Sequence, residues 1–323
     1  MKMLRFFAKP NIDFLKIGHV MLPISCVIIA FSLGFMAYKG KAMMGIDFTG
    51  GTRLTYEYKE RIQETSIEES LAKGGFPSAK AAYKTNVMQN NKVIEIVLPT
   101  KDLNFEGKII NPVDQVKDML NKSFPKIELN KGEEVTIGGL IGLEFTKAAI
   151  LAFILANVGI IVFLSLRFEF AYGVAAFIAL MHDIIIATGI FLFFGGELSL
   201  QVVAALLTIV GYSVNDTIIV FDRIREDVGL VKNKGYKDII NLSINQTLSR
   251  TIITSFTVFL VVLIMFIMGG NAMKDFVFVM LIGVVVGTYS SIFVASPIVS
   301  IWHKRLGTKL MTDQKEGNKV AVK

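Results

Sequence analysis

Six long apolar runs divide the chain, and each is long enough for a helix that crosses a membrane. Such a helix needs about 20 mostly apolar residues. The first run covers about residues 19–38, and a long, mostly polar stretch separates it from the other five. The pattern predicts a polytopic α-helical membrane protein with six transmembrane helices. The five later runs cover about 148–166, 171–194, 198–221, 252–268 and 276–301.

The segments between and around the runs complete the predicted organisation. Residues 1–18 combine basic and aromatic side chains, which favours a cytoplasmic segment at the membrane surface. Residues 39–142 are expected to form an external domain, 143–302 to hold transmembrane helices 2–6, and 303–323 to be a basic cytoplasmic tail. Basic residues gather on the side of both chain ends, so both termini are expected in the cytoplasm. The first run lacks a cleavage site and is interpreted as a retained anchor.

The polar stretch has the pattern of a small α+β domain. Residues 53–58 alternate with a period of two, as a half-buried strand does. Thr65 and Glu68 have the spacing of a capping box at the start of a helix. The strand–helix–strand–strand–helix–strand order predicts a ferredoxin-like fold. After the first strand we expect a helix ended by Gly74 and Gly75, strands at about 79–86 and 92–98, a helix opened by Pro112, and a strand at about 133–137.

Glycines gather where this domain joins the membrane helices. Because glycine leaves the backbone angles open, the domain is interpreted as able to tilt on a hinge at these positions. Ordinary tight turns explain the same glycines equally well. They are Gly45, Gly50 and Gly51 on the way out, beside Asp47, and Gly138, Gly139 and Gly142 on the way back.

An acidic residue inside the fourth run is the leading functional candidate. A charge at the bilayer centre costs roughly 3 kcal/mol, so Asp216 is expected to face the interior of the helix bundle. Arg250, at the start of the fifth run, is its expected counter-charge. The alternatives are a structural hydrogen bond for Asp216, an interhelical amide for Asn215 and a snorkelling side chain for Arg250.

Other polar and small residues within the runs are weaker candidates for a functional role. His182 and Asp183, near the middle of the third run, are a second functional candidate, and a structural hydrogen-bonded pair is the alternative. One histidine and one carboxylate are too few ligands for a metal site. Gly283 and Gly287 have the spacing of close helix packing, and Pro297 predicts a kink.

Composition narrows the function further. The 323 residues are 53% hydrophobic and carry a formal net charge of +7. The basic residues lie at the ends of the apolar runs, where they meet anionic lipid, so nucleic acid is not an expected partner. The only cysteine, Cys26, lies in the first run. No nucleophile–histidine pair occurs outside the runs, so we expect no enzyme activity and no cofactor.

Four segments together resemble a known family. The fourth run and its continuation have the most specific motif. Combined with the six-run layout, the segments resemble the SecF subunits of the SecD/SecF family of bacterial protein-export membrane proteins, in the resistance-nodulation-division superfamily. The segments are GIDFTGGT at 45–52, LMHD at 180–183, VGYSVNDTIIVFDRIRE at 210–226 and SRTIITS at 249–255.

The resemblance implies partners and a mechanism. It implies SecD as a partner with six further spans, association with the SecYEG channel and often YajC, and a place in the bacterial inner membrane with a periplasmic domain. It implies that the proton-motive force drives late, SecA-independent steps of preprotein export, with protons as the coupling ion and Asp216 and Arg250 tied to their passage. Asn215, His182 and Asp183 are the further candidates for this proton relay. The alternatives are half of a proton-driven lipid or drug exporter, and a passive scaffold whose buried charges only fix assembly.

Overall fold

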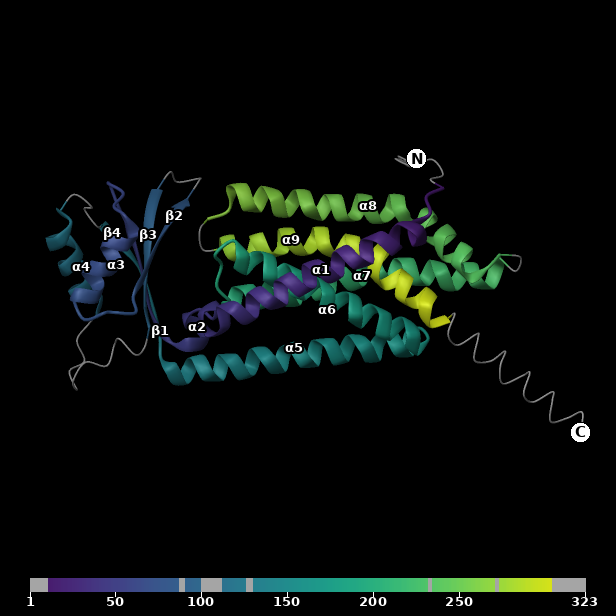
Figure 1. Ribbon diagram of the computed structural model, residues 1–323, viewed down its shortest axis with the longest axis horizontal. Coiled ribbons are helices and arrows are strands. Elements are labelled where there is room, and N and C mark those ends of the chain that lie inside the picture. The colour runs from purple at the N-terminus through teal and green to yellow at the C-terminus, as the bar shows by residue number, and fades with distance from the viewer. Residues whose placement is uncertain are drawn as a thin grey trace, which may run out of the picture.

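The structure is a computed structural model that describes residues 11–86, 91–99, 112–125, 130–231, 234–270 and 273–303. Within these residues, six helices are long and apolar enough to cross a membrane, which confirms the predicted number. They form one bundle, with the α+β domain at one end (Figure 1). The helices are α1 (Phe14–Lys39), α5 (Gly139–Arg167), α6 (Phe170–Phe193), α7 (Leu200–Leu230), α8 (Tyr236–Met268) and α9 (Lys274–Ser290), which a π-helical turn (Ser291–Ala295) continues.

Several helices are longer than the apolar runs that predict them, because polar helical turns continue past the apolar part. The helix α1 begins at Phe14, so part of the segment expected at the membrane surface belongs to this helix. Its N-cap is Asp13, whose carboxylate accepts a hydrogen bond from the backbone N–H of Lys16 at 3.0 Å. Residues 1–10 and 304–323 lie outside the described residues, so the structure leaves the predictions for them open.

The α+β domain has the predicted order of elements. Its four strands form one antiparallel sheet in the order β2-β3-β1-β4, in which Leu54 of β1 pairs with Ile96 of β3. This topology confirms the ferredoxin-like prediction. The elements are β1 (Gly51–Glu57), α3 (Glu64–Lys73), β2 (Lys80–Asn86), β3 (Asn91–Pro99), α4 (Pro112–Ser123) and β4 (Asn130–Ile137).

The predicted capping box is wrong. The helix α3 begins at Glu64, one residue before Thr65, and its N-cap Gln63 makes no side-chain cap. The carboxylate of Glu68 instead accepts a hydrogen bond from the backbone N–H of Ala81 on β2, at 3.1 Å. Glu68 therefore ties a helix to the edge of the sheet, which is a contact that local spacing does not reveal.

One face of the sheet is covered and the other is open. The helices α3 and α4 cover the face of the sheet that is turned away from the bundle (Figure 1). Buried side chains of the sheet and of these two helices form the domain core there. The open face is directed toward the near end of the helix bundle. The core includes Leu54, Tyr56, Ile67, Leu71, Ile94, Ile96, Leu98, Val116 and Leu120.

Within the bundle, α6, α7 and α9 are the most buried helices. Apolar side chains of α1, α5 and α8 remain exposed, as expected for surfaces that meet lipid or another subunit. A bend follows α9, where the π-helical turn ends two residues before Pro297 (Figure 1). Proline lacks a backbone N–H, so the wider turn accommodates it, in agreement with the predicted kink.

Candidate functional site

Asp216 lies on the buried side of α7, with a side chain that is 1% exposed. The hydroxyl of Ser255 on α8 donates a hydrogen bond to its Oδ2 at 2.9 Å. The Oδ1 atom has no hydrogen-bond partner within the described part of the chain, and neither does the buried hydroxyl of Thr251, one turn before Ser255. Asp216 is therefore a buried carboxylate between two membrane helices with spare capacity to bind a proton.

Asn215 and Arg250 do not join Asp216 inside the bundle. Asn215 is exposed, because adjacent residues of a helix point about 100° apart. Arg250 is also exposed, and no ion pair between it and Asp216 is found among the described residues. The expected counter-charge thus lies outside the buried site in this conformation.

Arg250 lines a groove of about 550 Å³ between α7 and α8. The groove also contains Asp222, Arg223 and Glu226 from the C-terminal part of α7. Arg223 forms ion pairs with Glu226 at 2.8 Å and with Asp227 at 3.1 Å. The groove is therefore a strongly charged surface at the end of the bundle remote from the α+β domain.

A second buried carboxylate connects three helices. Asp183 on α6 accepts hydrogen bonds from the hydroxyls of Ser213 on α7 at 2.5 Å and Ser290 on α9 at 2.8 Å. Its other oxygen lies 2.8 Å from Nδ1 of His182. Asp183 is 0% exposed and His182 is 3% exposed, so the cluster is enclosed. The serines had no place in the interpretation of the sequence, where their only signal was a polar side chain inside an apolar run.

The glycines of the last span pack against α7. A Cβ atom added to Gly283 would lie 2.2 Å from Cδ1 of Ile209, and one added to Gly287 would lie 3.1 Å from Cβ of Ser213. Both values are below an ordinary van der Waals contact. These glycines therefore set the approach of α9 to the helix that carries Asp216.

The glycine-rich segments 45–51 and 138–142, which join the α+β domain to the helix bundle, form the neck of the domain. The segment before β1 is packed against the bundle. The short helix α2 (Ile46–Thr49) lies here, and the backbone N–H of Gly45 donates to the carbonyl of Leu198 at 2.7 Å. Leu198 in turn donates to the carbonyl of Met43 at 2.7 Å. The carboxylate of Asp47 accepts from the backbone N–H of Leu200, the first residue of α7, at 2.8 Å. The neck is thereby attached to the loop between α6 and α7.

Positive φ values or close backbone contacts explain four of the neck glycines. Gly50 and Gly51 have φ values of 72° and 143°, which favour glycine. A Cβ atom on Gly45 would lie 2.8 Å from the carbonyl oxygen of Leu198, and one on Gly142 would lie 2.8 Å from that of Phe48. Each of these positions therefore needs glycine for conformation or close approach, whether or not the domain tilts there.

A metal ion has no evident ligand set in the part of the chain that the structure describes, which contains no group of three or more His, Cys, Asp or Glu side chains placed to hold one. The polar clusters around Asp216 and Asp183 consist of carboxylates, hydroxyls and one imidazole, which are groups that bind and exchange protons.

Comparison with known proteins gives the family. Residues 115–305, more than half of the chain, match the family described as protein export membrane protein SecD/SecF, C-terminal, and residues 44–60 match the SecD/SecF GG motif. The protein translocase subunit SecF of Thermodesulfovibrio yellowstonii is 36% identical over 307 residues, which cover 94% of this chain and 98% of that protein.

Two solved structures are also similar. The crystal structure of SecDF from Thermus thermophilus matches with a TM-score of 0.78 and 34% identity, over 91% of this chain and 39% of that one. A SecDF structure in a super-membrane-facing form matches with a TM-score of 0.63 and 30% identity, over 95% of this chain and 40% of that one. This chain thus corresponds to about two fifths of a SecDF chain. It belongs to the SecF subunits of the SecD/SecF family of protein-export membrane proteins.

Proposed function

We propose that this subunit of the Sec protein translocase works with SecD to couple the proton-motive force to late steps of preprotein export. The family gives it a role in Sec-dependent export, and the match to SecDF, in which both parts share one chain, supports SecD as the partner. The proton-driven step is the part that the proposal adds. In this proposal, both chain ends lie in the cytoplasm and the α+β domain lies in the periplasm.

The observation that carries the proposal is the enclosure of Asp216 between α7 and α8. An ionised carboxylate at this depth is costly, and binding of a proton removes the charge. Ser255 holds one oxygen at 2.9 Å, and the other has no hydrogen-bond partner within the described part of the chain. Proton binding and release at Asp216 would therefore change the interaction between these two helices.

Exposed polar residues near Asp216 support a second subunit at this surface. Asn215 and Arg250 are both exposed on α7 and α8 in the isolated chain. Polar side chains in membrane helices usually face other helices or water-filled cavities. We infer that SecD covers this surface, and that Arg250 takes part in proton passage from a position at its edge, where a change in helix packing or water can connect it to Asp216. His182 and Asp183 form the second polar cluster in the proposed relay.

One continuous helix connects Asp216 to the neck of the α+β domain. Asp216 lies on α7, and the first residue of α7 is bonded to Asp47 in the neck of the domain. A proton that crosses a potential of 100 mV gains about 2.3 kcal/mol, which is of the size that biases a two-state conformational change. A small shift of α7 would thus be passed directly to the domain, as a tilt about the neck glycines.

The test uses Asp216→Asn and Arg250→Ala in inner-membrane vesicles with SecD and SecYEG. Both variants should assemble with SecD, yet lose completion of preprotein transit that depends on the proton-motive force, while the ATP-driven step remains. Thr257→Ala is a matched control, because Thr257 lies near Ser255 on α8 but its hydroxyl donates to the carbonyl of Thr254 within the same helix and not to Asp216. If Asp216→Asn vesicles complete transit at the wild-type rate when energised, the proton assignment is wrong.

A further inference from the structure

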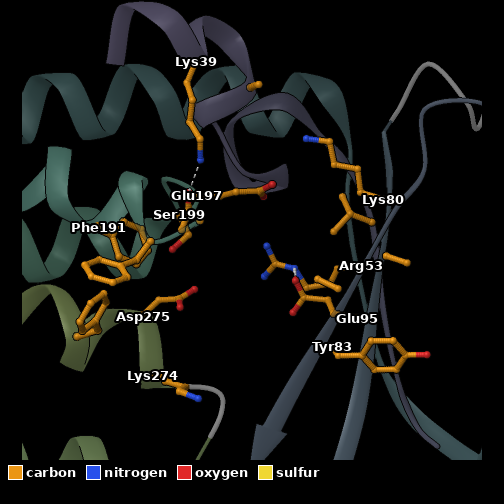
Figure 2. A pocket seen from close by; sticks show the side chains of 18 of the residues that line it. Lys39, Arg53, Lys80, Tyr83, Glu95, Phe191, Glu197, Ser199, Lys274 and Asp275 are labelled. Carbon is orange, nitrogen blue, oxygen red and sulfur yellow. Dashed lines mark hydrogen bonds and ion pairs between the residues drawn. The ribbon is translucent and has the colours of Figure 1, made fainter. Parts of the chain in front are cut away.

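A cavity of about 630 Å³ separates the open face of the sheet from the near end of the helix bundle (Figure 2). Residues of β1, β2 and β3 line one side. The other side is lined by the ends of α6, α8 and α9 and by the loop between α6 and α7. Its volume is typical of a ligand site, which ranges over about 300–1,000 Å³.

The cavity meets the edge of the sheet as well as its open face. Arg53, Glu95 and Val97 reach it from the open face, as their alternate positions on β1 and β3 require. The consecutive residues 80–83 of β2 also line it. Side chains of consecutive strand residues point to opposite faces, so this run brings the backbone of β2 to the cavity. In Figure 2 the ring of Tyr83 points away from the cavity while Lys80 borders it.

The strand β2 is the outermost strand of the sheet and pairs only with β3 in the described residues. The N–H of Ala81 points to the outer edge, where the carboxylate of Glu68 on α3 occupies it. Because the pattern alternates, the N–H and carbonyl of Tyr83 also point to this edge. An extended peptide could pair with an edge of this kind by adding a strand.

Aromatic side chains line the cavity on the side of the helix bundle. Phe278 of α9 lies at the centre, with ring centroids 5.7 Å from Phe194 and 5.6 Å from Phe266. Phe194 is 68% exposed, so most of its ring is available to contact a bound apolar side chain. Rings of this size accept many different apolar side chains, because stacking and burial need no particular shape.

The charges of the cavity balance. Carboxylates reach toward the sheet from the bundle, while the guanidinium of Arg53 reaches toward the bundle and pairs with Glu95 at 3.6 Å (Figure 2). A site for a phosphate-bearing ligand would have an excess of basic groups, and this lining has none. The basic residues are Lys39, Arg53, Lys80 and Lys274, and the acidic residues are Glu68, Glu95, Glu197 and Asp275.

We propose that this cavity binds an extended segment of the exported polypeptide, which pairs with the edge of β2 and places apolar side chains on the ring of Phe194 and its neighbours. This inference rests on the proposed role in export and names the surface that holds the client. A strand edge recognises any backbone, aromatic rings recognise any apolar side chain, and balanced charges repel neither acidic nor basic segments. The site therefore suits clients of unrelated sequence.

Cross-linking in the complete complex tests the proposal. The photoreactive residue p-benzoylphenylalanine replaces Ala82 or Val97, which face the cavity, or Glu69, which is exposed on α3 at the covered face of the sheet. Each variant is assembled with SecD and SecYEG in vesicles, and a preprotein is stalled during ATP-driven transit without a proton-motive force. We expect several-fold more cross-linking to the stalled chain from the two cavity positions than from Glu69.

The result is independent of the proton mechanism, because the stall needs none. A second variant, Phe194→Ala, should remove the exposed ring and lower the cross-linking yield from Val97, whereas Glu69→Ala should leave it unchanged. Adducts with phospholipid or SecD alone, or equal yields from Glu69 and the cavity positions, would overturn the proposal. Co-purification of SecD verifies that each variant has assembled.

Discussion

The carboxylate of Asp47 accepts a hydrogen bond from the backbone N–H of Leu200 at 2.8 Å, across 153 residues of chain. Asp47 lies in the neck of the α+β domain, and Leu200 begins the helix that carries Asp216. The first N–H groups of a helix have no partner within the helix, and a carboxylate there is also favoured by the helix dipole. This single bond therefore connects the neck to α7 at its positive end.

Replacement of Asp47 should uncouple the domain from α7. Asp47→Ala leaves the N–H of Leu200 without this acceptor, which should cost about 1 kcal/mol of stability. Asp47→Asn keeps an acceptor oxygen and should be milder. We expect Asp47→Ala to assemble with SecD but to slow export driven by the proton-motive force, measured in energised vesicles.

The matched control for this prediction is Ser199→Ala. Ser199 caps the same helix by accepting from the N–H of Val202 at 3.3 Å, but this bond joins α7 to its own N-cap and does not involve the neck. Its loss should reduce stability by about the same 1 kcal/mol and leave export near normal. Equal export defects in both variants would mean that helix stability alone is responsible.

The neck shows why part of the site could not be read from the sequence. The glycines at 45, 50 and 51 predicted conformational freedom, and their positive φ values agree for Gly50 and Gly51. Their packing against Leu198 depends on a loop far away in the chain, which no local pattern reveals. The hinge itself stays a prediction.

For Asp216 and its neighbour Asn215, the sequence predicted the burial of one residue but not the orientation of both. The cost of a charge in a membrane correctly predicted that Asp216 faces the interior. Which of the two neighbours would be inside depends on the rotation of α7, and this rotation is set by contacts such as that of Gly283 with Ile209. The apolar pattern located the six helices because each run is long. It did not predict where the helices end, because their ends are polar.

Gly283 should not tolerate a side chain. The Cβ atom of Gly283→Ala would lie 2.2 Å from Cδ1 of Ile209, so α7 and α9 must separate or Ile209 must move. Overpacking of this kind typically costs about 1–3 kcal/mol. Unfolding of the purified protein in mild detergent should detect the loss.

Gly159→Ala is the control for this substitution, because the structure has open space around Gly159 on α5. It should be neutral or slightly stabilising, since alanine favours a helix. The double variant Gly283→Ala/Ile209→Ala should lose less stability than the sum of the two single variants. Additive losses would contradict a direct clash between these residues.

Asp183 and Ser213 should be energetically coupled. The hydroxyl of Ser213 donates to Asp183, whereas that of Ser290 also has the carbonyl of Gly287 as a second acceptor at 3.1 Å. Asp183→Ala should therefore leave Ser213 the more poorly satisfied, at a cost of about 1–3 kcal/mol for a buried group. A double-mutant cycle with Ser213→Ala, followed by denaturation in detergent, measures the coupling.

The same cycle with Ser290→Ala provides the comparison. Its coupling to Asp183 should be smaller, because Ser290 keeps its bond to Gly287 after the carboxylate is removed. A larger coupling for Ser290 than for Ser213 would show that Asp183 mainly holds α9, and would contradict the stronger dependence of Ser213 on this carboxylate.

Tyr56 should make the α+β domain sensitive to alkaline pH. Burial in the domain core, with smaller contributions from the charges of Glu134 and Asp114, raises the pKa of Tyr56 to about 12. The ordinary tyrosine pKa is about 10, so between these values the folded domain keeps a proton that the unfolded chain has lost. The contribution of Tyr56 to stability is therefore complete below about pH 10 and is lost as the pH rises toward about 12.

Phenylalanine at this position has no proton to lose. The stability of Tyr56→Phe should thus fall less steeply than that of the wild type between about pH 10 and pH 12, in denaturant unfolding followed by circular dichroism. In the folded protein, the same substitution should remove tyrosinate absorbance only from the late part of the alkaline titration. Loss of absorbance from the early part, near the ordinary pKa, would mean that the phenol of Tyr56 is open to solvent and that the core around Leu54 and Ile94 is not closed over it.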